Sequence, residues 1–381
     1  MKIKLGIDQI DQYLHIFENK RVGLMTNPTG MNSKLESTIN ILHKKTNLVS
    51  LFAPEHGIRG ELQAGVHFND YVDEQTDCKV YSVYGKSKAP SSDMLKEVDV
   101  ICFDIQDVGA RFYTFIYSMA YAMMACSKHN KTFVVFDRPN PLGGLKVEGH
   151  LLDLAYRSFV GYYPIVQRYG LTIGELANYF NDVFNIGCDL KVIPMQGWKR
   201  HMTFNDLKMP WIFPSPNIPT ALTTFHYLAT CYFEGTNVSE GRGTTKPFQM
   251  FGAPWFHADQ MIDALNKLQL KGVMFRKVYF TPTFSKHKDQ LCEGIDILIT
   301  DVDTFEPVKL GMHLLDLIPK YHLEFEVIKP FKKGRKCMLE FLLGHGYFTD
   351  NKKDIDVILK EMEKDQKQFI QMKGKYHLYD E

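Results

Sequence analysis

The chain has 381 residues, of which 45% are hydrophobic and 23% are charged, a composition typical of globular proteins with a sizeable core. It excludes a disordered, collagen-like or coiled-coil protein, and the length favours two domains over one. The 45 basic and 44 acidic side chains leave a net charge of +1, so the chain has no general attraction to nucleic acid or to anionic membranes. Seven scattered cysteines, an odd number without a CxxC pair, predict buried free thiols rather than a disulfide framework.

The N-terminal segment shows no signal peptide, because the polar residues Asp8 and Gln9 come before an apolar region can form. No apolar run approaches the ~18–20 residues that span a bilayer. We therefore expect no membrane span. The protein is expected to be cytoplasmic if the chain is complete as written, and periplasmic or secreted if an export signal has been removed.

Short apolar strands alternate with amphipathic helices through the first half of the chain. The strand patterns lie at 21–25, 47–52, 79–83, 98–105, 132–136 and 190–194. The helix patterns lie near 34–43, 92–98, 113–128 and 172–184. Thr172 and Glu175 have the capping-box spacing at the start of the last helix. This alternation predicts an α/β domain with a mainly parallel sheet, and the uniformly apolar strands indicate helices on both faces.

The sequence changes character after Trp211, where Pro-rich and then Gly-rich segments follow. We expect a domain boundary near residue 226, with one domain at 1–226 and a second at 227–381. The segment 234–254 is dense in Gly, Thr and Asn and predicts a loop. Later patterns predict helices near 259–268 and 310–321, strands near 273–281 and 295–300, and an amphipathic C-terminal helix that carries Ile355, Ile358, Leu359 and Met362.

Polar loops follow four of the predicted strands. They are TNPTG from Thr26, APEHG from Ala53, QDVGAR from Gln106 and DRPNPLGG from Asp137. Because parallel strands end at the same edge of a sheet, we expect these loops to line one cleft, joined by the segment 234–245. Plain connectors do not need charged side chains at nearly every strand end, so the pattern favours a functional site.

Common nucleotide and hydrolase motifs are missing from the sequence. No GxGxxG follows the first strand, and Val80 stands where the leading glycine of a P-loop has to be. Neither HExxH nor GxSxG occurs, and no compact metal-ligand spacing appears. We therefore expect no nucleotide, no other cofactor and no metal.

Glu55 is the strongest acid–base candidate, because it follows a buried strand and precedes His56. A partly buried Glu beside apolar residues can have its pKa raised enough to donate a proton near neutral pH. A structural Glu paired with Arg59 is the alternative interpretation.

The segment 234–248, EGTNVSEGRGTTKPF, places carboxylates, hydroxyls, an amide and an Arg on a glycine-rich backbone. Such groups suit the hydroxyls and amides of a sugar, and an irregular domain linker is the alternative. Five further charged side chains lie at or just beyond the strand ends. They either belong to a functional site or stabilise the loops themselves: Asp104, Asp107, Asp137, Arg111 and Arg138. Three tryptophans could stack on a sugar face or pack in the core: Trp198, Trp211 and Trp255.

These strings resemble the NamZ-type exo-β-N-acetylmuramidase family, formerly a domain of unknown function. The matching strings are GLMTNPTG, LFAPEHGIRG, VYSVYG, FDIQDVGARFYT, DRPNPLGG, PSPNIPT and EGTNVSEGRGTTKPF, in the order of the family. The resemblance implies a Rossmann-like catalytic domain and a smaller α+β auxiliary domain that contributes to the cleft. It implies hydrolysis of terminal β-1,4-linked N-acetylmuramic acid from the non-reducing end of peptidoglycan fragments, without a cofactor.

The resemblance also implies the site residues. The glutamate of PEHG, the proposed catalytic acid of the family, corresponds to Glu55. The other candidates in matching strings are His56, Arg59, Asn140, Asn237, Glu240 and Arg242. Glycoside hydrolysis usually needs a second carboxylate, for which Glu240 and Glu234 come before Asp104, unless the 2-acetamido group of the substrate assists.

N-acetylmuramic acid carries a lactyl carboxylate, and a bidentate guanidinium matches that group best. Arg242 is the first candidate for this contact and Arg59 the second. The alternative is that either arginine simply pairs with Glu55, Glu240 or Glu61. Two other functions remain open. A metal-dependent deacetylase or amidase acting on cell-wall fragments would lose activity to chelators, and a non-catalytic muropeptide-binding protein would tolerate Glu55→Gln.

Overall fold

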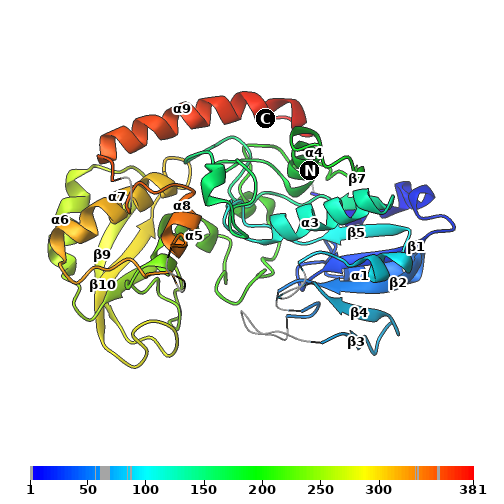
Figure 1. Cartoon of the computed structure of the whole chain (residues 1–381), viewed down its shortest axis with the longest axis horizontal. Helices are drawn as coiled ribbons and strands as arrows, with labels where there is room; N and C mark the ends of the chain where they lie inside the picture. Colours follow the sequence, from blue (N-terminus) through cyan, green and yellow to red (C-terminus); the bar gives the residue numbers. More distant parts are fainter. Residues whose placement is uncertain are drawn as a thin grey trace.

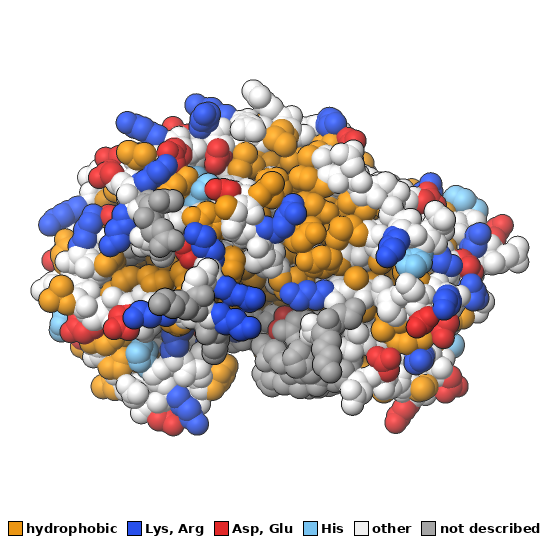
Figure 2. All heavy atoms as spheres, viewed as in Figure 1, with side chains coloured by type: hydrophobic (Ala, Val, Ile, Leu, Met, Phe, Trp, Pro, Cys, Tyr) orange, Lys and Arg blue, Asp and Glu red, His pale blue; other side chains and the backbone are white. Residues whose placement is uncertain are grey.

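The computed structural model describes residues 3–55, 57–60, 69–83, 85, 88–330, 332, 334–349 and 352–381. Two lobes lie side by side, each built on its own sheet, and the long helix α9 (Ile355–Lys373) lies across both (Figure 1). Figure 2 shows a hollow between the lobes, with Lys and Arg side chains gathered beside it.

The first sheet has seven strands in the order β3-β4-β2-β1-β5-β6-β7. Their bounds are β1 Arg21–Thr26, β2 Asn47–Ala53, β3 Tyr71–Val72, β4 Lys79–Ser82, β5 Val100–Asp104, β6 Thr132–Phe136 and β7 Asp189–Ile193. Only the two-residue β3 runs antiparallel to its neighbour. Without β3, the strands follow the order 3-2-1-4-5-6 of Rossmann-type sheets. The predicted α/β fold with a mainly parallel sheet is therefore confirmed.

Helices cover both faces of this sheet, as the apolar strands predicted. Side chains alternate along each strand, so Val22 and Leu24 of β1 enter one core and Met25 enters the other. The elements of the first lobe that pack on the sheet are the 3-10 helix η1 (Gly6–Gln12), α1 (Thr38–Lys45), α2 (Ser92–Lys96), α3 (Phe115–Lys128) and α4 (Ile173–Val183). Helix α4 begins with the predicted capping box of Thr172 and Glu175.

The second lobe contains a three-stranded antiparallel sheet in which β10 lies between β8 and β9. Its elements are α5 (Thr223–Thr230), β8 (Met250–Ala253), α6 (Ala258–Lys267), β9 (Val273–Phe280), β10 (Cys292–Ile299), α7 (Pro307–Tyr321) and α8 (Met338–Leu343). Strand β8 lies in the segment that was expected to be a loop. A Cβ on Gly252 would meet the Glu293 carbonyl oxygen at 2.2 Å, so this glycine serves the close approach of β8 and β10 rather than a turn.

The two lobes share packing at their junction. The loop after β5 places Val108 and Phe112 in the core of the second lobe. Helix α9 contributes Met362 to that core and Phe369 to the core of the first lobe. The expected boundary near residue 226 falls inside α5, and the C-terminal residues return to the first lobe. The lobes are therefore tied together at several points of the chain.

Burial explains the cysteine pattern. All seven cysteines are buried and free, as their odd and scattered occurrence predicted.

The 19-residue α9 is rich in charged side chains, and in the described part of the chain no helix has the length and apolar character needed to cross a membrane.

Candidate active site

A cavity of about 260 Å³ lies where the two lobes meet, and we call it the junction cavity. From the first lobe, it is lined by Glu55, two residues beyond β2, and by the stretch from Phe112 to Phe115 at the start of α3. From the second lobe, Glu234 and Arg242 line it. The cavity therefore has a carboxylate on each side and a cation on one.

Aromatic rings form much of the wall around Glu55. Tyr113 packs edge-on against Tyr227, with 5.8 Å between ring centroids, and against Phe115 at 5.2 Å. Burial, followed by the negative charges of Asp107 and Glu55, raises the pKa of Tyr113, which lines the cavity together with Glu55. Glu55 thus lies at the boundary between a charged region and an apolar aromatic surface.

Arg242 is held in a network of charges on the opposite wall. Its Nη2 lies 2.6 Å from Glu234 Oε1, and its Nε lies 3.1 Å from Glu240 Oε1. Although burial acts to lower it, the two carboxylates raise the pKa of Arg242, so the guanidinium stays charged. Gly241 and Gly243 flank it with φ angles of 78° and 80°, a left-handed conformation that glycine adopts readily.

Glu240 lies behind this wall rather than in it. Its side chain is 2% exposed, and its Oε2 accepts a hydrogen bond of 2.6 Å from Lys286 Nζ. Lys286 also donates to the carbonyl oxygens of Phe233 and Val238. Glu240 thus anchors Arg242 from the protein interior, whereas Glu234, with a side chain 27% exposed, lines the cavity.

The other expected site residues lie elsewhere in the structure. Arg59 pairs with the buried Asp73 at 2.6 Å. Asn140 Nδ2 donates to the Leu171 carbonyl, and Asn237 clamps the backbone of residues 324 and 326. None of these three is among the described residues that line the junction cavity. His56 lies outside the described residues.

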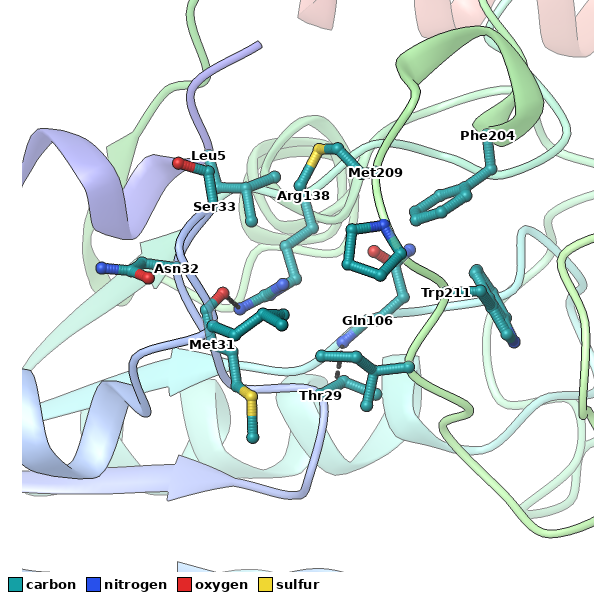
Figure 3. Close-up of a pocket in the computed structure, with 13 residues that line it drawn as sticks. Leu5, Thr29, Met31, Asn32, Ser33, Gln106, Arg138, Phe204, Met209 and Trp211 are labelled. Atoms are coloured by element: carbon teal, nitrogen blue, oxygen red, sulfur yellow. Dashed lines mark hydrogen bonds between the residues drawn. The ribbon is translucent and has the colours of Figure 1, made fainter.

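A second pocket lies between the ends of β1 and β5, where the strand order of the sheet reverses, and we call it the switch-point crevice. Its polar wall includes Thr29, Gln106 and Arg138, which are joined by short hydrogen bonds to neighbouring loops (Figure 3). Phe204 and Trp211 fill it from the connection between β7 and α5, leaving about 30 Å³. A volume this small holds about two water molecules.

The strand-end loops divide between two pockets rather than lining a single one, although Glu55 and Arg242 line the same cavity, as the sequence led us to expect. Thr29 of TNPTG and Arg138 of DRPNPLGG line the switch-point crevice, whereas Glu55 of APEHG lines the junction cavity. The loop after β5 reaches both, with Gln106 at the crevice and Phe112 at the cavity. Phe204 and Trp211, from the connection between β7 and α5, line the crevice as well.

Two strand-end aspartates are engaged in structural hydrogen bonds. Asp104 is fully buried and pairs with Arg138. Asp137 accepts from Thr172, from the Gly174 amide and from Tyr379, and burial raises its pKa to about 7.

Asp107 and Arg111 are buried, and neither has a partner of opposite charge among the residues that the structure describes. Burial raises the pKa of Asp107 to about 6, although it accepts hydrogen bonds from Tyr169 and from the Gly109 amide. Arg111 donates instead to four backbone carbonyls, among them those of Leu342 and Leu343 at the end of α8. The C-terminal end of a helix carries partial negative charge, which compensates a buried cation.

Sequence reasoning missed the aromatic and amide groups of the cavity wall. Tyr113 lies in FDIQDVGARFYT, while Ser215 and Asn217 lie in PSPNIPT, so the matching strings contained the signal. The tryptophans were the wrong aromatics to follow, because Trp198 is buried in the first core and Trp211 lines the switch-point crevice.

Comparisons with known proteins agree along the whole chain. The family model described as the N-terminal part of exo-β-N-acetylmuramidase NamZ matches residues 22–222, and the model for its C-terminal part matches residues 225–379. The peptidoglycan β-N-acetylmuramidase NamZ of Bacillus subtilis (strain 168) is 47% identical over 99% of this chain and 92% of its own length.

Two solved structures of DUF1343 family proteins from Bacteroides fragilis NCTC 9343 share the fold. One has a TM-score of 0.89 and 37% identity, covering 100% of this chain and 99% of the other. The second has a TM-score of 0.80 and 29% identity, covering 100% of both chains. The chain therefore belongs to the exo-β-N-acetylmuramidase NamZ family of glycosidases.

Proposed function

We propose that this protein is an exo-acting glycoside hydrolase that releases terminal β-1,4-linked N-acetylmuramic acid from the non-reducing end of peptidoglycan fragments. The observation that carries the proposal is the junction cavity, which has Glu55 on one wall and the Glu234–Arg242 pair on the other. Family membership and the muramidase from Bacillus subtilis support the same substrate. We also place the catalytic domain at 1–226, with 227–381 contributing the second wall.

In this proposal Glu55 is the general acid that protonates the glycosidic oxygen. Glycosidases pair such an acid with a second carboxylate, or with the substrate's own acetamido group. We assign the second role to Glu234, because it lines the cavity, and we assign to Glu240 the task of holding Arg242 in place. Tyr113 and Phe115 supply the apolar surface on which a sugar face can pack.

The lactyl carboxylate is the group that distinguishes N-acetylmuramic acid from N-acetylglucosamine. Arg242 uses Nη2 and Nε for the two glutamates, and its Nη1 makes no hydrogen bond to any described residue. We propose that Nη1 receives the lactyl carboxylate, because a charge-assisted bond of this kind fixes both position and sign. The Lys and Arg side chains beside the hollow between the lobes favour an anionic ligand (Figure 2).

The decisive experiment incubates the protein with a MurNAc-GlcNAc disaccharide and with a chromogenic β-N-acetylmuramide. We expect release of N-acetylmuramic acid by the wild type and loss of turnover in Glu55→Gln. Binding of the disaccharide without cleavage would instead support the alternative of a non-catalytic muropeptide-binding protein. Release of acetate from the disaccharide, or of a peptide from a muropeptide assayed in parallel, would instead assign the deacetylase or amidase activity if a chelator abolished it.

A matched pair of variants separates the two glutamates of the second wall. Glu234→Gln is expected to reduce kcat while the stability of the protein stays unchanged. Glu240→Gln removes the buried carboxylate that Lys286 and Arg242 share, so it is expected to reduce stability as well as kcat. The anomeric configuration of the first product, followed by NMR, tells whether Glu234 acts as a base or as a nucleophile. Wild-type kcat in Glu234→Gln would move the second role to another group or to the substrate.

A further inference from the structure

Two histidines and an aspartate meet where helix α9 crosses from one lobe to the other. His150 belongs to the first lobe, His345 follows α8 in the second, and Asp365 lies in the middle of α9. One possible donor atom from each of the three lies within 4.8 Å of the others. Among the described residues that line the junction cavity and the switch-point crevice, none belongs to this cluster.

His150 is the member whose environment is incomplete. Its side chain is 1% exposed, and in the described part of the chain neither ring nitrogen has a hydrogen-bond partner. Its Nδ1 lies 3.4 Å from Asp365 Oδ2. A buried imidazole whose Nδ1 has only this long contact and whose Nε2 has no partner among the described residues is costly, so this position favours a ligand that the protein itself does not supply.

His345 is oriented with a lone pair available. Its Nε2 lies 2.8 Å from the Leu151 carbonyl oxygen, which only accepts, so Nε2 carries the proton and Nδ1 does not. The amide of Leu151 in turn donates to Asp365 Oδ2 at 3.1 Å. The backbone N–H and C=O of Leu151 thus hold a carboxylate and a histidine, as the outer partners of metal-bound histidines do.

We propose that His150, His345 and Asp365 bind one divalent ion of the Zn²⁺ type, with water completing a tetrahedral shell. Imidazole nitrogen and carboxylate oxygen are ligands that Zn²⁺ accepts. The Asp365 side chain is 23% exposed, which leaves a side for the water and a route of entry. Ligand distances of ~2.0–2.2 Å separate the donors of a tetrahedral ion by ~3.3–3.6 Å, so donors that now lie up to 4.8 Å apart approach by up to roughly 1.5 Å on binding.

The ion acts as a clamp between the lobes and does not take part in hydrolysis. Arg111 already joins the same two loops by hydrogen bonds, because it donates to the carbonyls of His150 at 2.9 Å and Leu343 at 2.7 Å. The next residue, Phe112, lines the junction cavity. A bound ion therefore adds a coordinated link beside the hydrogen-bonded one, and both support the cavity from outside.

Zinc binding by the full chain tests the proposal, after the protein is stripped with a chelator and dialysed. Calorimetry is expected to show one Zn²⁺ per chain. The midpoint of thermal unfolding is expected to rise by about 2–5 °C once Zn²⁺ exceeds its Kd about 100-fold. Mg²⁺ prefers oxygen ligands and is expected to leave the midpoint unchanged.

Variants on one helix provide the matched comparison. Asp365→Asn keeps the shape of the side chain and an acceptor for Leu151 but removes the charge. Loss of an outer partner alone costs ~10–100-fold in metal affinity, so loss of this direct ligand is expected to cost at least about 100-fold. Glu363→Gln removes an exposed carboxylate two residues away and is expected to bind Zn²⁺ like the wild type.

Equal Zn²⁺ affinity in Asp365→Asn and the wild type would overturn the proposal, as would the absence of binding to the wild type. If Asp365→Asn does not fold, His345→Gln takes its place, with the same expected loss. The muramidase activity of the stripped protein, assayed below its melting temperature, is expected to persist. Activity that is abolished by chelation and restored by Zn²⁺ would overturn the clamp role and the proposed mechanism, even with the ion bound at these residues.

Discussion

The switch-point crevice and the junction cavity lie along the same edge of the first sheet, but they differ in what fills them. Phe204 and Trp211 line the crevice, which keeps about 30 Å³ of free space. Its polar groups form hydrogen bonds with the protein, Gln106 to Thr29 and Arg138 to the Met31 carbonyl. The junction cavity keeps about 260 Å³ and has Glu55 and Arg242 in its walls. A Rossmann-type sheet thus retains the polar loops of a ligand site at its switch point while the space for a ligand lies at the contact with the second lobe.

The two regions also treat their charges differently. At the crevice, Asp104 and Arg138 form a buried pair whose side chains are 0% and 5% exposed. At the cavity, the Glu234–Arg242 pair keeps about a quarter of each side chain exposed, at 27% and 24%. Buried pairs of the first kind support the fold, whereas pairs that reach solvent can exchange a partner for a substrate group. The following variants separate these two roles.

The largest effect is expected at the junction cavity, from Glu55→Gln. The amide keeps the size of the side chain but has no proton to donate, and positioned proton transfer contributes ~10²–10⁴-fold to rates. We expect kcat on the chromogenic muramide to fall by that factor while the thermal midpoint stays unchanged. Glu36→Gln, an exposed change in the same lobe, is the control. A folded Glu55→Gln protein with near-wild-type kcat would remove the acid role from Glu55.

The opposite result is expected at the crevice, from Asp104→Asn. The substitution leaves Arg138 buried without its carboxylate, which costs about 3–5 kcal/mol in comparable pairs. Denaturant unfolding is expected to show this loss, while kcat of the folded protein remains near the wild-type value. Asp189→Asn, at an exposed pair with Lys191, is expected to change stability by less than about 1 kcal/mol. A loss of turnover without a loss of stability in Asp104→Asn would assign chemistry to the crevice.

Arg242→Lys sharpens the account of specificity. Lysine keeps the charge, but its three donors share one nitrogen and cannot reproduce the planar fork with which Arg242 spans Glu234, Glu240 and a lactyl carboxylate. The loss of one charge-assisted bond is expected to reduce kcat/KM for the muramide about ten- to hundredfold, with a smaller effect on the matching glucosaminide. Arg276→Lys, at an exposed guanidinium in the same lobe, serves as the control. An unchanged ratio of the two substrates would mean that another group recognises the carboxylate.

Asp107 lies in the chain between the two regions and is expected to give the smallest effect. Burial raises its pKa to about 6, so the folded protein binds the proton more tightly than the unfolded chain between about pH 4 and pH 6. Stability therefore falls as pH rises through this window. Relative to Asp107→Asn, the wild type is expected to lose about 1–2 kcal/mol between pH 4 and pH 7 in denaturant unfolding. Parallel pH profiles would show that Asp107 does not titrate there.

Local pattern was enough to predict most of the first lobe. The strand at 132–136 and the capping box at Thr172 depend on neighbouring residues, and both appear as expected. Helix α5 was missed because tertiary burial, rather than a polar–apolar pattern, defines it: all eight of its residues are buried. Strand β8 was missed because it lies in a glycine-rich segment of the kind that usually forms a loop. In the structure, Gly252 instead allows β8 to approach β10 closely.

The site was predictable only in part, for a different reason. Glu55, Glu234 and Arg242 lie in distinctive strings, and the cavity brings them together. Burial decides which of the neighbouring glutamates faces the cavity, and a sequence does not show burial. His150 and Asp365 are 215 positions apart, so no local ligand spacing could reveal their cluster.

The tail of the chain has a consequence for how the protein is made. The hydroxyl of Tyr379 donates to Asp137 and accepts from the Met195 amide, and the Arg200 amide donates to the Asp380 carbonyl. These contacts complete the first lobe at the ends of β6 and β7, strands that leave the ribosome long before residue 379 does. At ~5–20 residues per second, the interval from β7 to the tail is on the order of ten to forty seconds. During that time the nascent first lobe lacks the partners that Tyr379 and Asp380 supply, and a truncation before residue 379 would leave Asp137, Met195 and Arg200 without them.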